Sequence, residues 1–418
     1  MNTKRVAILG AGISGLSAAH FLKTLRPDVE CVLFEKEERV GGVIQSSRED
    51  GIFFEHGPRT FATNRTPQLL ALIKDMGLED DIHFSSARNR YVLHDGNVRK
   101  IPDNIVRLLF SPFGKGIIPA IFKDLRHPPG LIPDETIESF ILRHGNKNVL
   151  EQIIDPMVMG IFAGDTSKLS VGACFPSWKR FEYKHGSIIK GVYKTKNKST
   201  LPPLYTLKDG MHSLPEKLAA SLPYQMRLNT HVESIIEKEG GVEINGEFFD
   251  HALVCLPSKV ASSMLPEKYF PFFQGIEHIT LNVVNVAFEN VSVPKDGFGY
   301  LAPTKERADI FGVVFDSSVF PEHHMKDYTR LTVMLPGDDN LESRALSALR
   351  SHLKITKDPL QVKVRRYQDY LPQLLVGHLE RRDHLAAKHL SFVGNYLHSV
   401  SVESCIVEAE KAVKALSL

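Results

Sequence analysis

The feature that most constrains this chain is a short apolar run that ends in three spaced glycines. Residues Val6 to Leu9 lead into Gly10-Ala11-Gly12-Ile13-Ser14-Gly15, and a helical pattern follows at once. Strand, glycine turn and helix in this order form the dinucleotide-binding fingerprint. Gly10 permits the sharp turn, Gly12 leaves room for a pyrophosphate, and Gly15 lets the helix pack on the strand. The pyrophosphate would lie on free N–H groups at the positive end of the helix.

An acidic residue and a second glycine pair favour FAD as the nucleotide. Glu35 closes the next strand-like run, twenty residues after Gly15, where an acidic side chain accepts hydrogen bonds from an adenosine ribose. The alternative is an ordinary αβ turn with an incidental glutamate, which the register of the parts disfavours. Gly41-Gly42 follow within one short loop, and enzymes that use NAD seldom carry this pair. The combined pattern resembles the long fingerprint of flavoenzymes related to amine oxidases, and this resemblance implies FAD, bound without a covalent link.

Composition excludes several classes of protein. With 51 basic and 49 acidic residues, no overall charge favours nucleic acid as a partner. The four cysteines are far apart and form no CxxC, so they indicate neither a disulfide framework nor a zinc site and fit a reducing compartment. No stretch approaches the ~20 apolar residues of a transmembrane helix, and no signal peptide is recognisable. We expect a cytoplasmic protein, either free or peripheral on the inner face of the cytoplasmic membrane.

Strand and helix patterns predict an α/β fold with a Rossmann-type FAD-binding domain, a second mixed-sheet substrate domain and a helical subdomain. The FAD-binding domain is expected in three parts, residues 1–90, 204–260 and 385–418. The mainly helical subdomain is expected over residues 91–203, and the sheet-based domain over residues 261–384. In the last part, a strand turns at Gly394 into a helix from about Ser401, so Gly394 would approach the cofactor.

Three segments have open interpretations. Between Ile105 and Arg126, large apolar residues interleave with basic ones, which fits either an anionic membrane surface or a helical subdomain with one buried face. Arg59 follows Gly57-Pro58 on a constrained turn and either faces the flavin or an anionic substrate group, or makes a structural salt bridge. Residues 160–165 are expected to form a glycine-containing loop that lines a pocket. His323-His324 are expected in a surface loop rather than as metal ligands.

The chain resembles the oxygen-dependent protoporphyrinogen oxidase family, which includes bacterial members acting on coproporphyrinogen III. The family usually has glycines where this chain has His398-Ser399, and two glycines where it has Asp209-Gly210. The segments that carry the resemblance lie in family order along almost the whole chain: Gly10–Gly15 through Gly41-Gly42, Gly57-Pro58-Arg59, residues 160–165, 206–214 and 297–301, Pro372-Gln373 with Gly377-His378, Gly394-Asn395-Tyr396, Val400-Ser401-Val402 and Cys405-Ile406.

The resemblance implies a chemistry and a set of site residues. A bridge carbon of the porphyrinogen gives hydride to flavin N5 and a pyrrole nitrogen loses a proton, in three steps that each end with reoxidation by oxygen to hydrogen peroxide. No side chain is implied as a catalytic residue, and no metal is expected. The implied substrate-binding residues are Arg59, Ile161, Phe162, Gly164 and Tyr300. The implied cofactor-binding residues are Gly10, Gly12, Ile13, Ser14, Gly15, Glu35, Lys36, Gly41, Gly42, Gly57, Pro58, Val232, Gly394, Asn395, Val400 and Val402.

The resemblance leaves the substrate open between protoporphyrinogen IX and coproporphyrinogen III. Beyond Arg59, the named pocket residues are apolar, which favours the dicarboxylic protoporphyrinogen, although Arg180 or Lys184 could supply further charge. The product is expected to pass to a downstream enzyme of the heme pathway. Two alternatives remain: another FAD oxidase acting on amines or carotenoids, and a non-catalytic escort-type protein of the same fold. Val400-Ser401-Val402 disfavours an amine oxidase, and Glu35 with Gly41-Gly42 disfavours an escort protein.

Overall fold

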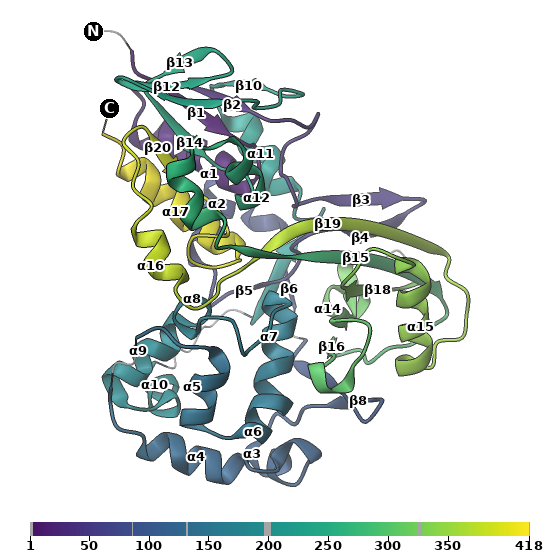
Figure 1. Ribbon diagram of the computed structural model, residues 1–418. Coiled ribbons are helices and arrows are strands. Elements are labelled where there is room, and N and C mark those ends of the chain that lie inside the picture. Colours follow the sequence, from purple (N-terminus) through teal and green to yellow (C-terminus); the bar gives the residue numbers. More distant parts are fainter. Residues whose placement is uncertain (1–2, 86, 131–132, 196–201, 324–327, 418) are drawn as a thin grey trace.

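The computed structural model describes residues 3–85, 87–130, 133–195, 202–323 and 328–417. Figure 1 shows a nucleotide-binding part that carries both ends of the chain, a sheet with one covering helix beside it, and a helical lobe below.

The nucleotide-binding part is built on a five-stranded parallel sheet in the order β10-β2-β1-β14-β20. These strands come from three separate stretches of the chain: β1 (Arg5–Leu9), β2 (Glu30–Phe34), β10 (Gln225–Arg227), β14 (His251–Val254) and β20 (Leu390–Phe392). Most of their residues are buried because both faces are covered, which explains their continuous apolar runs.

Helices cover one face of this sheet and a small antiparallel sheet covers the other. The helices are α1 (Ile13–Leu25), α2 (Pro67–Asp75), α11 (Ser213–Ser221) and α17 (Val402–Lys414). The opposite layer comprises β11 (Ile235–Lys238), β12 (Gly241–Ile244) and β13 (Glu247–Phe249), with α12 (Ser258–Met264) and α13 (Phe270–Phe273) beside them. Nearby lie the hairpin β3 (Ser46–Glu49) and β4 (Ile52–Glu55), the strands β5 (Phe61–Ala62), β6 (Ile82–Ser85) and β9 (Leu204–Leu207), and α16 (His378–Asp383).

The second sheet has seven strands in the order β19-β15-β18-β17-β16-β7-β8. Its strands are β7 (Asn89–His94), β8 (Asn97–Lys100), β15 (Glu277–Glu289), β16 (Gly297–Leu301), β17 (Gly312–Val314), β18 (Tyr328–Leu335) and β19 (Gln361–Gln373). All pairs are antiparallel except β16 with β7. The helix α15 (Leu341–Leu353) packs on one face, whereas the short α14 (Asp316–Val319) lies on the other. The long strands β15 and β19 reach from this sheet to the nucleotide-binding part (Figure 1).

The helical lobe surrounds a core of its own. It contains α3 (Ile105–Leu109), α4 (Ile117–Arg126), α5 (Ile137–His144), α6 (Lys147–Val149), the π-helical turn η3 (Leu150–Ile154), α7 (Asp155–Phe162), α8 (Val171–Cys174), α9 (Pro176–His185) and α10 (Ile188–Lys194). Short 3-10 turns elsewhere are η1 (Glu79–Asp81), η2 (Pro112–Gly114), η4 (Glu267–Tyr269), η5 (Thr304–Glu306) and η6 (Pro321–His323). Among the described residues, none of the helices is long and apolar enough to cross a bilayer.

Two local predictions are wrong. Residues 160–162 belong to α7 rather than to a loop, and the helix ends only at Ala163, whose φ is +48°. Gly160 lies inside this helix because a Cβ there would come within 2.6 Å of the Leu301 side chain. His323 is 4% exposed and its ring nitrogen Nε2 lies 2.9 Å from the carbonyl oxygen of Leu207, so it is a buried residue. His324 lies outside the described residues.

Candidate flavin and substrate site

The glycine turn after β1 leaves open space at the start of α1. Gly10 has a φ of +99°, and a Cβ on Gly15 would lie 1.9 Å from the carbonyl oxygen of Gly10. By contrast, a Cβ on Gly12 would meet no atom within 4 Å, and no side chain caps the helix that begins at Ile13. Ser14 follows in the first turn. Free N–H groups facing open space fit the pyrophosphate of a dinucleotide.

Glu35 and the second glycine pair lie against this turn. The buried Glu35 carboxylate accepts hydrogen bonds from the backbone N–H groups of Ala11, at 2.8 Å, and Glu37, at 3.0 Å. Each carboxylate oxygen keeps a second lone pair for a ribose hydroxyl. The N–H of Gly41 donates to the carbonyl of Ala11 at 2.8 Å, and a Cβ on Gly42 would lie 3.3 Å from the Cα of Gly12. The exposed Lys36 pairs with Glu37 at 3.4 Å.

The other predicted cofactor residues come from three further loops. A Cβ on Gly57 would lie 1.9 Å from the carbonyl oxygen of Val43, so the Gly57-Pro58 turn runs directly against the loop after Gly42. A hydrogen bond of 2.8 Å from Thr230 N–H to the Glu35 carbonyl brings the segment of the buried Val232 beside Glu35. Gly394-Asn395 follow β20 directly, and Val400 and Val402 flank Ser401, whose side chain caps α17.

Apart from the Gly57-Pro58 turn, which follows β4, these loops follow the carboxyl ends of β1, β2, β10 and β20, where open parallel sheets bind nucleotides. The residues present therefore fit an FAD, although each individual contact stays a prediction.

Arg59 lies at the junction between the Gly57-Pro58 turn and the second sheet. Its Nη1 is 3.0 Å from Oδ1 of Asp316, and the two side chains are 11% and 12% exposed. The same nitrogen contacts Thr332 Oγ1 and lies 3.4 Å from Asn285 Oδ1. The structure thus shows the internal ion pair that was one of the two interpretations of Arg59. Its role toward a substrate stays a prediction.

Two titratable groups beside Arg59 are perturbed by burial. Glu55 accepts hydrogen bonds of 2.8 Å from Ser46 Oγ and from the backbone N–H of Met211, and burial raises its pKa to about 7. Burial, together with the nearby Arg59 charge, lowers the pKa of His56 to about 4, so this imidazole is neutral at pH 7. The Tyr367 hydroxyl donates to the His56 carbonyl at 3.1 Å, a contact that ties β19 to the same junction.

Strand register defines two adjacent rows of side chains on the sheet face opposite α15. The first row runs through Arg90, Gly299, Val314, Thr332, Asn285 and Lys363. The second row, here called the apolar row, runs through Val92, Leu301, Gly312, Met334 and Val283, and ends at Arg365. Leu301 packs on α7 at Gly160, so this face is the one turned toward the helical lobe.

Of the predicted substrate residues, Tyr300 faces α15 rather than the helical lobe. It is 1% exposed in the core beneath α15, and its hydroxyl lies 2.9 Å from His352 Nδ1. The neighbouring Leu301 faces α7 instead, because side chains alternate along a strand. The face on which Tyr300 lies depends on the register of β16. A bulge at Gly299, whose φ is +144°, shifts that register, and the sequence alone does not reveal the shift.

The other predicted substrate residues lie in or just after α7. Ile161 is 43% exposed, whereas Phe162 is 3% exposed and packs edge to face against Phe175. A Cβ on Gly164 would come within 2.3 Å of Gln373 Oε1, so this glycine makes room for a side chain from the end of β19. Ile161 is therefore the member of this group with an accessible apolar surface.

Arg90 was missed in the sequence. Its guanidinium lies over the Phe298 ring at 4.2 Å and donates to the Ala87 carbonyl at 3.3 Å, but within the described ranges it has no carboxylate partner. Burial lowers its pKa from the usual value. Arg90 could have been identified from the spacing of Arg90, Val92 and His94. Residues two apart in a strand share one face, so the arginine lies beside an apolar residue there.

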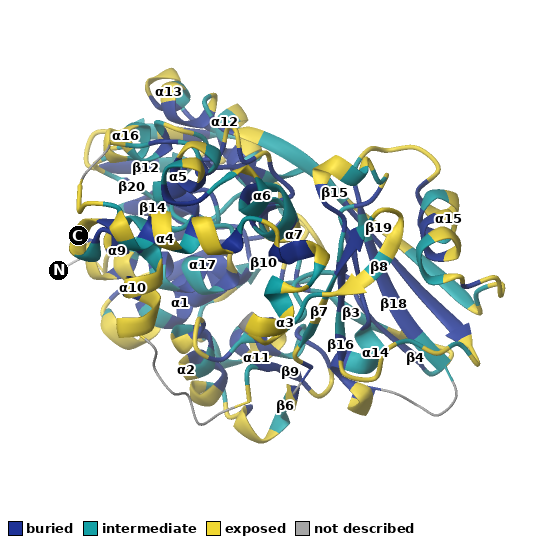
Figure 2. Ribbon diagram, turned by 90° about the horizontal axis from the view of Figure 1, so that it is seen from below, coloured by how far each residue is buried: buried dark blue, intermediate teal, exposed yellow. Residues whose placement is uncertain are grey.

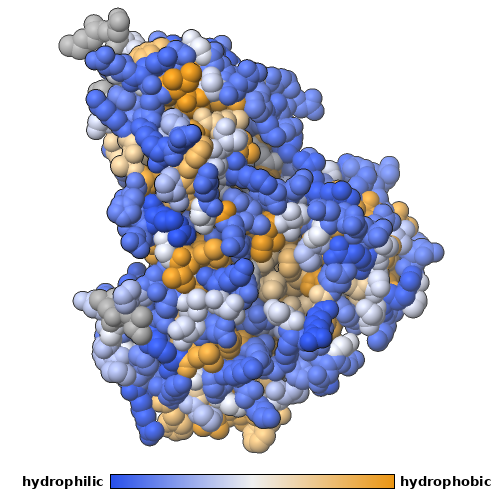
Figure 3. All heavy atoms as spheres, viewed as in Figure 1, coloured by the Kyte–Doolittle hydropathy of each residue, from blue (hydrophilic) through white to orange (hydrophobic). Residues whose placement is uncertain are grey.

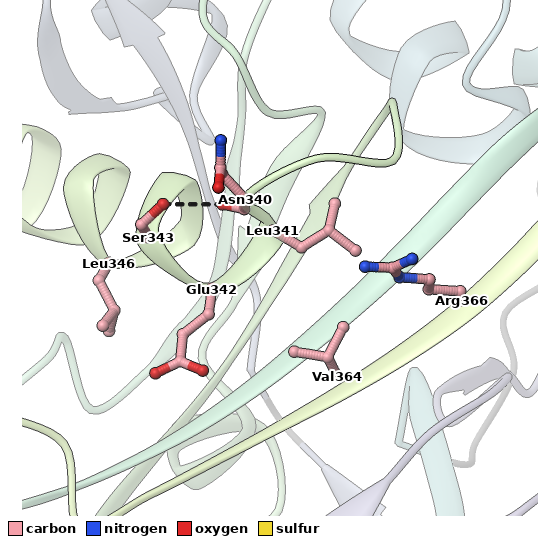
Figure 4. A pocket seen from close by; sticks show the side chains of 7 residues that line it. All are labelled: Asn340, Leu341, Glu342, Ser343, Leu346, Val364 and Arg366. Atoms are coloured by element: carbon pink, nitrogen blue, oxygen red, sulfur yellow. Dashed lines mark hydrogen bonds between the residues drawn. The ribbon is translucent and has the colours of Figure 1, made fainter.

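Figure 3 shows hydrophobic surface gathered in the recess where the helical lobe, the nucleotide-binding part and the second sheet meet. A cavity of about 610 Å³ lies elsewhere, between the start of α15 and the strand β19 (Figure 4). Its residues Val364 and Arg366 pair in register with Val284 and Asn282, on the face that α15 covers. The cavity beside α15 therefore lies on the opposite side of the sheet from Arg59 and Arg90.

Comparison with known proteins agrees with these features. The sequence profile of the family described as flavin containing amine oxidoreductase matches residues 13–417. Protoporphyrinogen oxidase of Bos taurus is 30% identical over 98% of this chain and 97% of its own length. Coproporphyrinogen III oxidase of Staphylococcus aureus (strain NCTC 8325 / PS 47) is also 30% identical, over 99% of this chain and 98% of its own.

Solved structures share the fold over the full length. A suggested protoporphyrinogen oxidase from Exiguobacterium sp. 255-15 superimposes with a TM-score of 0.88 at 23% identity, covering 99% of both chains. Reduced UDP-galactopyranose mutase gives 0.75 at 14% identity, covering 99% of this chain and 95% of its own. The glycine fingerprint, the family profile and the full-length relatives agree: the chain belongs to the flavin-containing amine oxidoreductases, and within them to the family of the protoporphyrinogen and coproporphyrinogen III oxidases.

Proposed function

We propose that this chain oxidises a porphyrinogen to the porphyrin, with FAD as cofactor and oxygen as acceptor. The observation that supports this most is the apolar row with arginines at its border. Arg90 and Thr332, the latter in contact with Arg59, are three strands apart, roughly 14 Å at ~4.8 Å for each strand. A flat, apolar tetrapyrrole with carboxylates at its edge matches such a strip, since concave sites for large ligands combine apolar lining with few charged groups.

The chain's own residues would bind and orient, and FAD would supply the two-electron acceptor when bound. Gly10, Gly12, Gly15 and Ser14 would face the pyrophosphate, and Glu35 the ribose. Gly41-Gly42, Gly57-Pro58, Val232, Gly394-Asn395, Val400 and Val402 would line the rest of the cofactor. The pyrrole proton requires an acceptor. In this proposal no side chain is assigned that step, and solvent water would accept the proton.

We propose protoporphyrinogen IX, with two propionates, as the preferred substrate. The additional cation Arg90 makes coproporphyrinogen III almost as good a candidate. The sequence argument for the dicarboxylic substrate was that the pocket residues beyond Arg59 are apolar. Arg90 and Arg365 now add cations at the ends of the same sheet face. Four propionates require cations on more than one side of the site, and Arg90 and Arg365 would provide them in this proposal.

Steady-state oxidation of both porphyrinogens, with oxygen uptake and peroxide measured in parallel, tests the proposal. We expect porphyrin from at least one substrate with stoichiometric peroxide. A kcat/KM at least tenfold higher for coproporphyrinogen III would reverse the substrate order. Absence of porphyrin from either substrate, with a flavin-loaded enzyme, would contradict the proposed function. Oxidation of an amine or a carotenoid under the same conditions would favour the alternative classes.

The outer surface of the helical lobe supports attachment to an anionic membrane as part of this proposal. Phe110 is 89% exposed, Val106 57%, Phe122 53% and Ile118 49%. Basic residues accompany them on the same helices and turns, namely Arg107, Lys115, Lys123 and Arg126. The helix α4 buries Ile117, Ala120 and Asp124, so it has a buried face, yet apolar residues also occupy its outer face. Figure 2 shows exposed residues along α4, in contrast to the buried strand β18.

A further inference from the structure

The guanidinium of Arg59 is held by one of its nitrogens only. Nη1 contacts Asp316 Oδ1 at 3.0 Å and also reaches Thr332 and Asn285, whereas Nε and Nη2 have no hydrogen-bond partner within the described parts of the chain. An arginine meets a carboxylate with two parallel N–H groups. The edge formed by Nε and Nη2 is therefore available for a second carboxylate while Asp316 stays in place.

Asp316 is itself fixed. It is the first residue of α14 and its side chain is 12% exposed. Its second oxygen lies 2.7 Å from Thr332 Oγ1, and that hydroxyl lies 2.7 Å from Asn285 Oδ1 as well. The threonine thus joins Asp316 to β15 and β18, the strands that carry the site face. An acid held on both oxygens has little freedom to rotate away from Arg59.

The surrounding charges favour binding of one additional anion. Arg330 is 3% exposed on the same sheet face, and its Nη1 donates to the Phe53 carbonyl at 2.9 Å. Its Nε and Nη2 are buried without a hydrogen-bond partner among the described residues, and the guanidinium lies over the Phe53 ring at 5.4 Å. Two arginines therefore face one fully engaged aspartate, while the fourth group, Glu55, is protonated in part near neutral pH because of its burial. A cluster with an excess of positive charge attracts a carboxylate.

We propose that Asp316 is a positioning residue, which fixes Arg59 through Nη1 so that the free edge of the guanidinium receives one propionate of the substrate. This role rests on the proposed porphyrinogen oxidase function. It assigns Asp316 no contact with the substrate.

Two substitutions separate geometry from charge. Asp316→Ala removes the acceptor for Nη1, so Arg59 loses its orientation. Asp316→Asn keeps an amide oxygen in the same place and removes only the charge, which repels a propionate. We expect Asp316→Ala to weaken binding of protoporphyrin IX about tenfold and Asp316→Asn to bind it at least as tightly as the parent, because only the former loses the hydrogen bond.

The matched probe is the dimethyl ester of protoporphyrin IX, which has the same ring and no carboxylates. Quenching of porphyrin fluorescence gives both dissociation constants on the flavin-loaded enzyme, and flavin absorbance with circular dichroism verifies that each variant is folded. With the ester, both Asp316 variants should bind like the parent. In turnover, Asp316→Ala should raise KM about tenfold and leave kcat within about twofold, since orientation of a remote carboxylate is uniform binding.

Glu135→Gln serves as the control, because Glu135 is a buried acid paired with Arg143 in the helical lobe, away from the site. It should leave both dissociation constants unchanged. Equal binding of protoporphyrin IX by Asp316→Ala and the parent would overturn the positioning role. So would a loss for the ester as large as for the acid, or a loss in Asp316→Asn as large as in Asp316→Ala. If the parent itself binds neither porphyrin, the proposed function fails instead.

Discussion

Gly164 and Gln373, which are far apart in the sequence, occupy the same space at the end of α7. The amide of Gln373 donates to the Phe162 carbonyl at 3.0 Å, and its oxygen lies where a side chain on residue 164 would begin. Gly164→Ala should therefore destabilise the protein by about 1–3 kcal/mol through overpacking. Thermal unfolding followed by circular dichroism measures the change. Gly172→Ala in α8 is the control, since its Cβ would meet only ordinary contacts of 3.4 Å or more; equal melting temperatures for both variants would contradict this prediction.

Gly12→Val and Gly15→Ala should have opposite consequences. A Cβ at residue 12 enters open space, so Gly12→Val should fold with a melting temperature close to that of the parent apoprotein but should lose its flavin, because the side chain takes the place of the pyrophosphate. A Cβ at residue 15 collides with the backbone of Gly10, so Gly15→Ala should fail to fold stably. Flavin absorbance and circular dichroism measure both effects. Full flavin occupancy in Gly12→Val would show that the nucleotide lies elsewhere.

Substitution of Arg59 or Arg90 by alanine should lower activity to a similar extent, but only the Arg59 substitution should also lower stability. Each alanine substitution should lower kcat/KM for the porphyrinogen about thirtyfold, on the order of 2 kcal/mol, and Arg59→Lys should recover only part of the loss. Arg59→Ala also leaves Asp316 buried without its partner and should lower the melting temperature. Arg90 pairs with no carboxylate within the described ranges, so Arg90→Ala should leave the melting temperature close to that of the parent. Parallel kinetics and melting curves measure this. Loss of flavin in Arg59→Ala would make Arg59 a cofactor residue instead.

The protein should lose stability between pH 6.5 and pH 4. Burial lowers the pKa of His56, His251, His323 and His378 to about 4 each. As pH falls below about 6.5 the unfolded chain binds protons that the folded chain does not, so each histidine lowers the free energy of unfolding by about 1.4 kcal/mol per pH unit.

Glu55, whose pKa is raised to about 7, increases the free energy of unfolding as the pH falls from about 7 to about 4.5. This single group only partly offsets the effect of the four histidines. Urea unfolding at pH 7.5 and pH 5 measures the net slope, and His251→Gln should reduce it by roughly a third, since the net slope is that of four histidines less one glutamate. A free energy of unfolding that is flat across this range would show that the four imidazoles are not desolvated.

Phe110 and Phe122 should mediate binding to anionic vesicles. The double substitution Phe110→Ser with Phe122→Ser should abolish sedimentation with phosphatidylglycerol vesicles at low salt, and high salt should weaken binding of the parent because the basic residues are screened. Leu360→Ser is the control, since Leu360 is 54% exposed at the far end of the second sheet. Failure of the parent to sediment at either salt concentration would leave these side chains as ordinary exposed residues.

Local features of the sequence were predicted well. The glycine turn, the acid after β2 and the start of the last helix at about Ser401 depend on residues close in the chain, and the structure has each in the expected place. The fold class is likewise confirmed, because alternating strand and helix patterns leave few architectures for a chain of this length.

The remaining features depend on pairings between distant residues. The partner of Arg59 is 257 positions away and could not be found without the packing of α14 on the second sheet. Tyr300 was predicted to line the site, but the register set by the bulge at Gly299 makes Leu301 the residue that faces α7. The segment 160–165 was expected to be a loop because glycines disfavour helices, but contact with Leu301 requires a glycine within α7.

The parallel sheet that opens the chain has its edge strand β20 in residues 390–392, and α17, the last helix, packs against α1. Residues 10–15 of the predicted nucleotide site are thus synthesised long before the stretch from β20 to α17 that completes it. Until that later stretch has left the ribosome, β14 has an unpaired edge and the predicted flavin loops lack Gly394 and the start of α17. We therefore expect the flavin to bind only after this stretch has folded, and a truncation that removes β20 and α17 to abolish flavin binding.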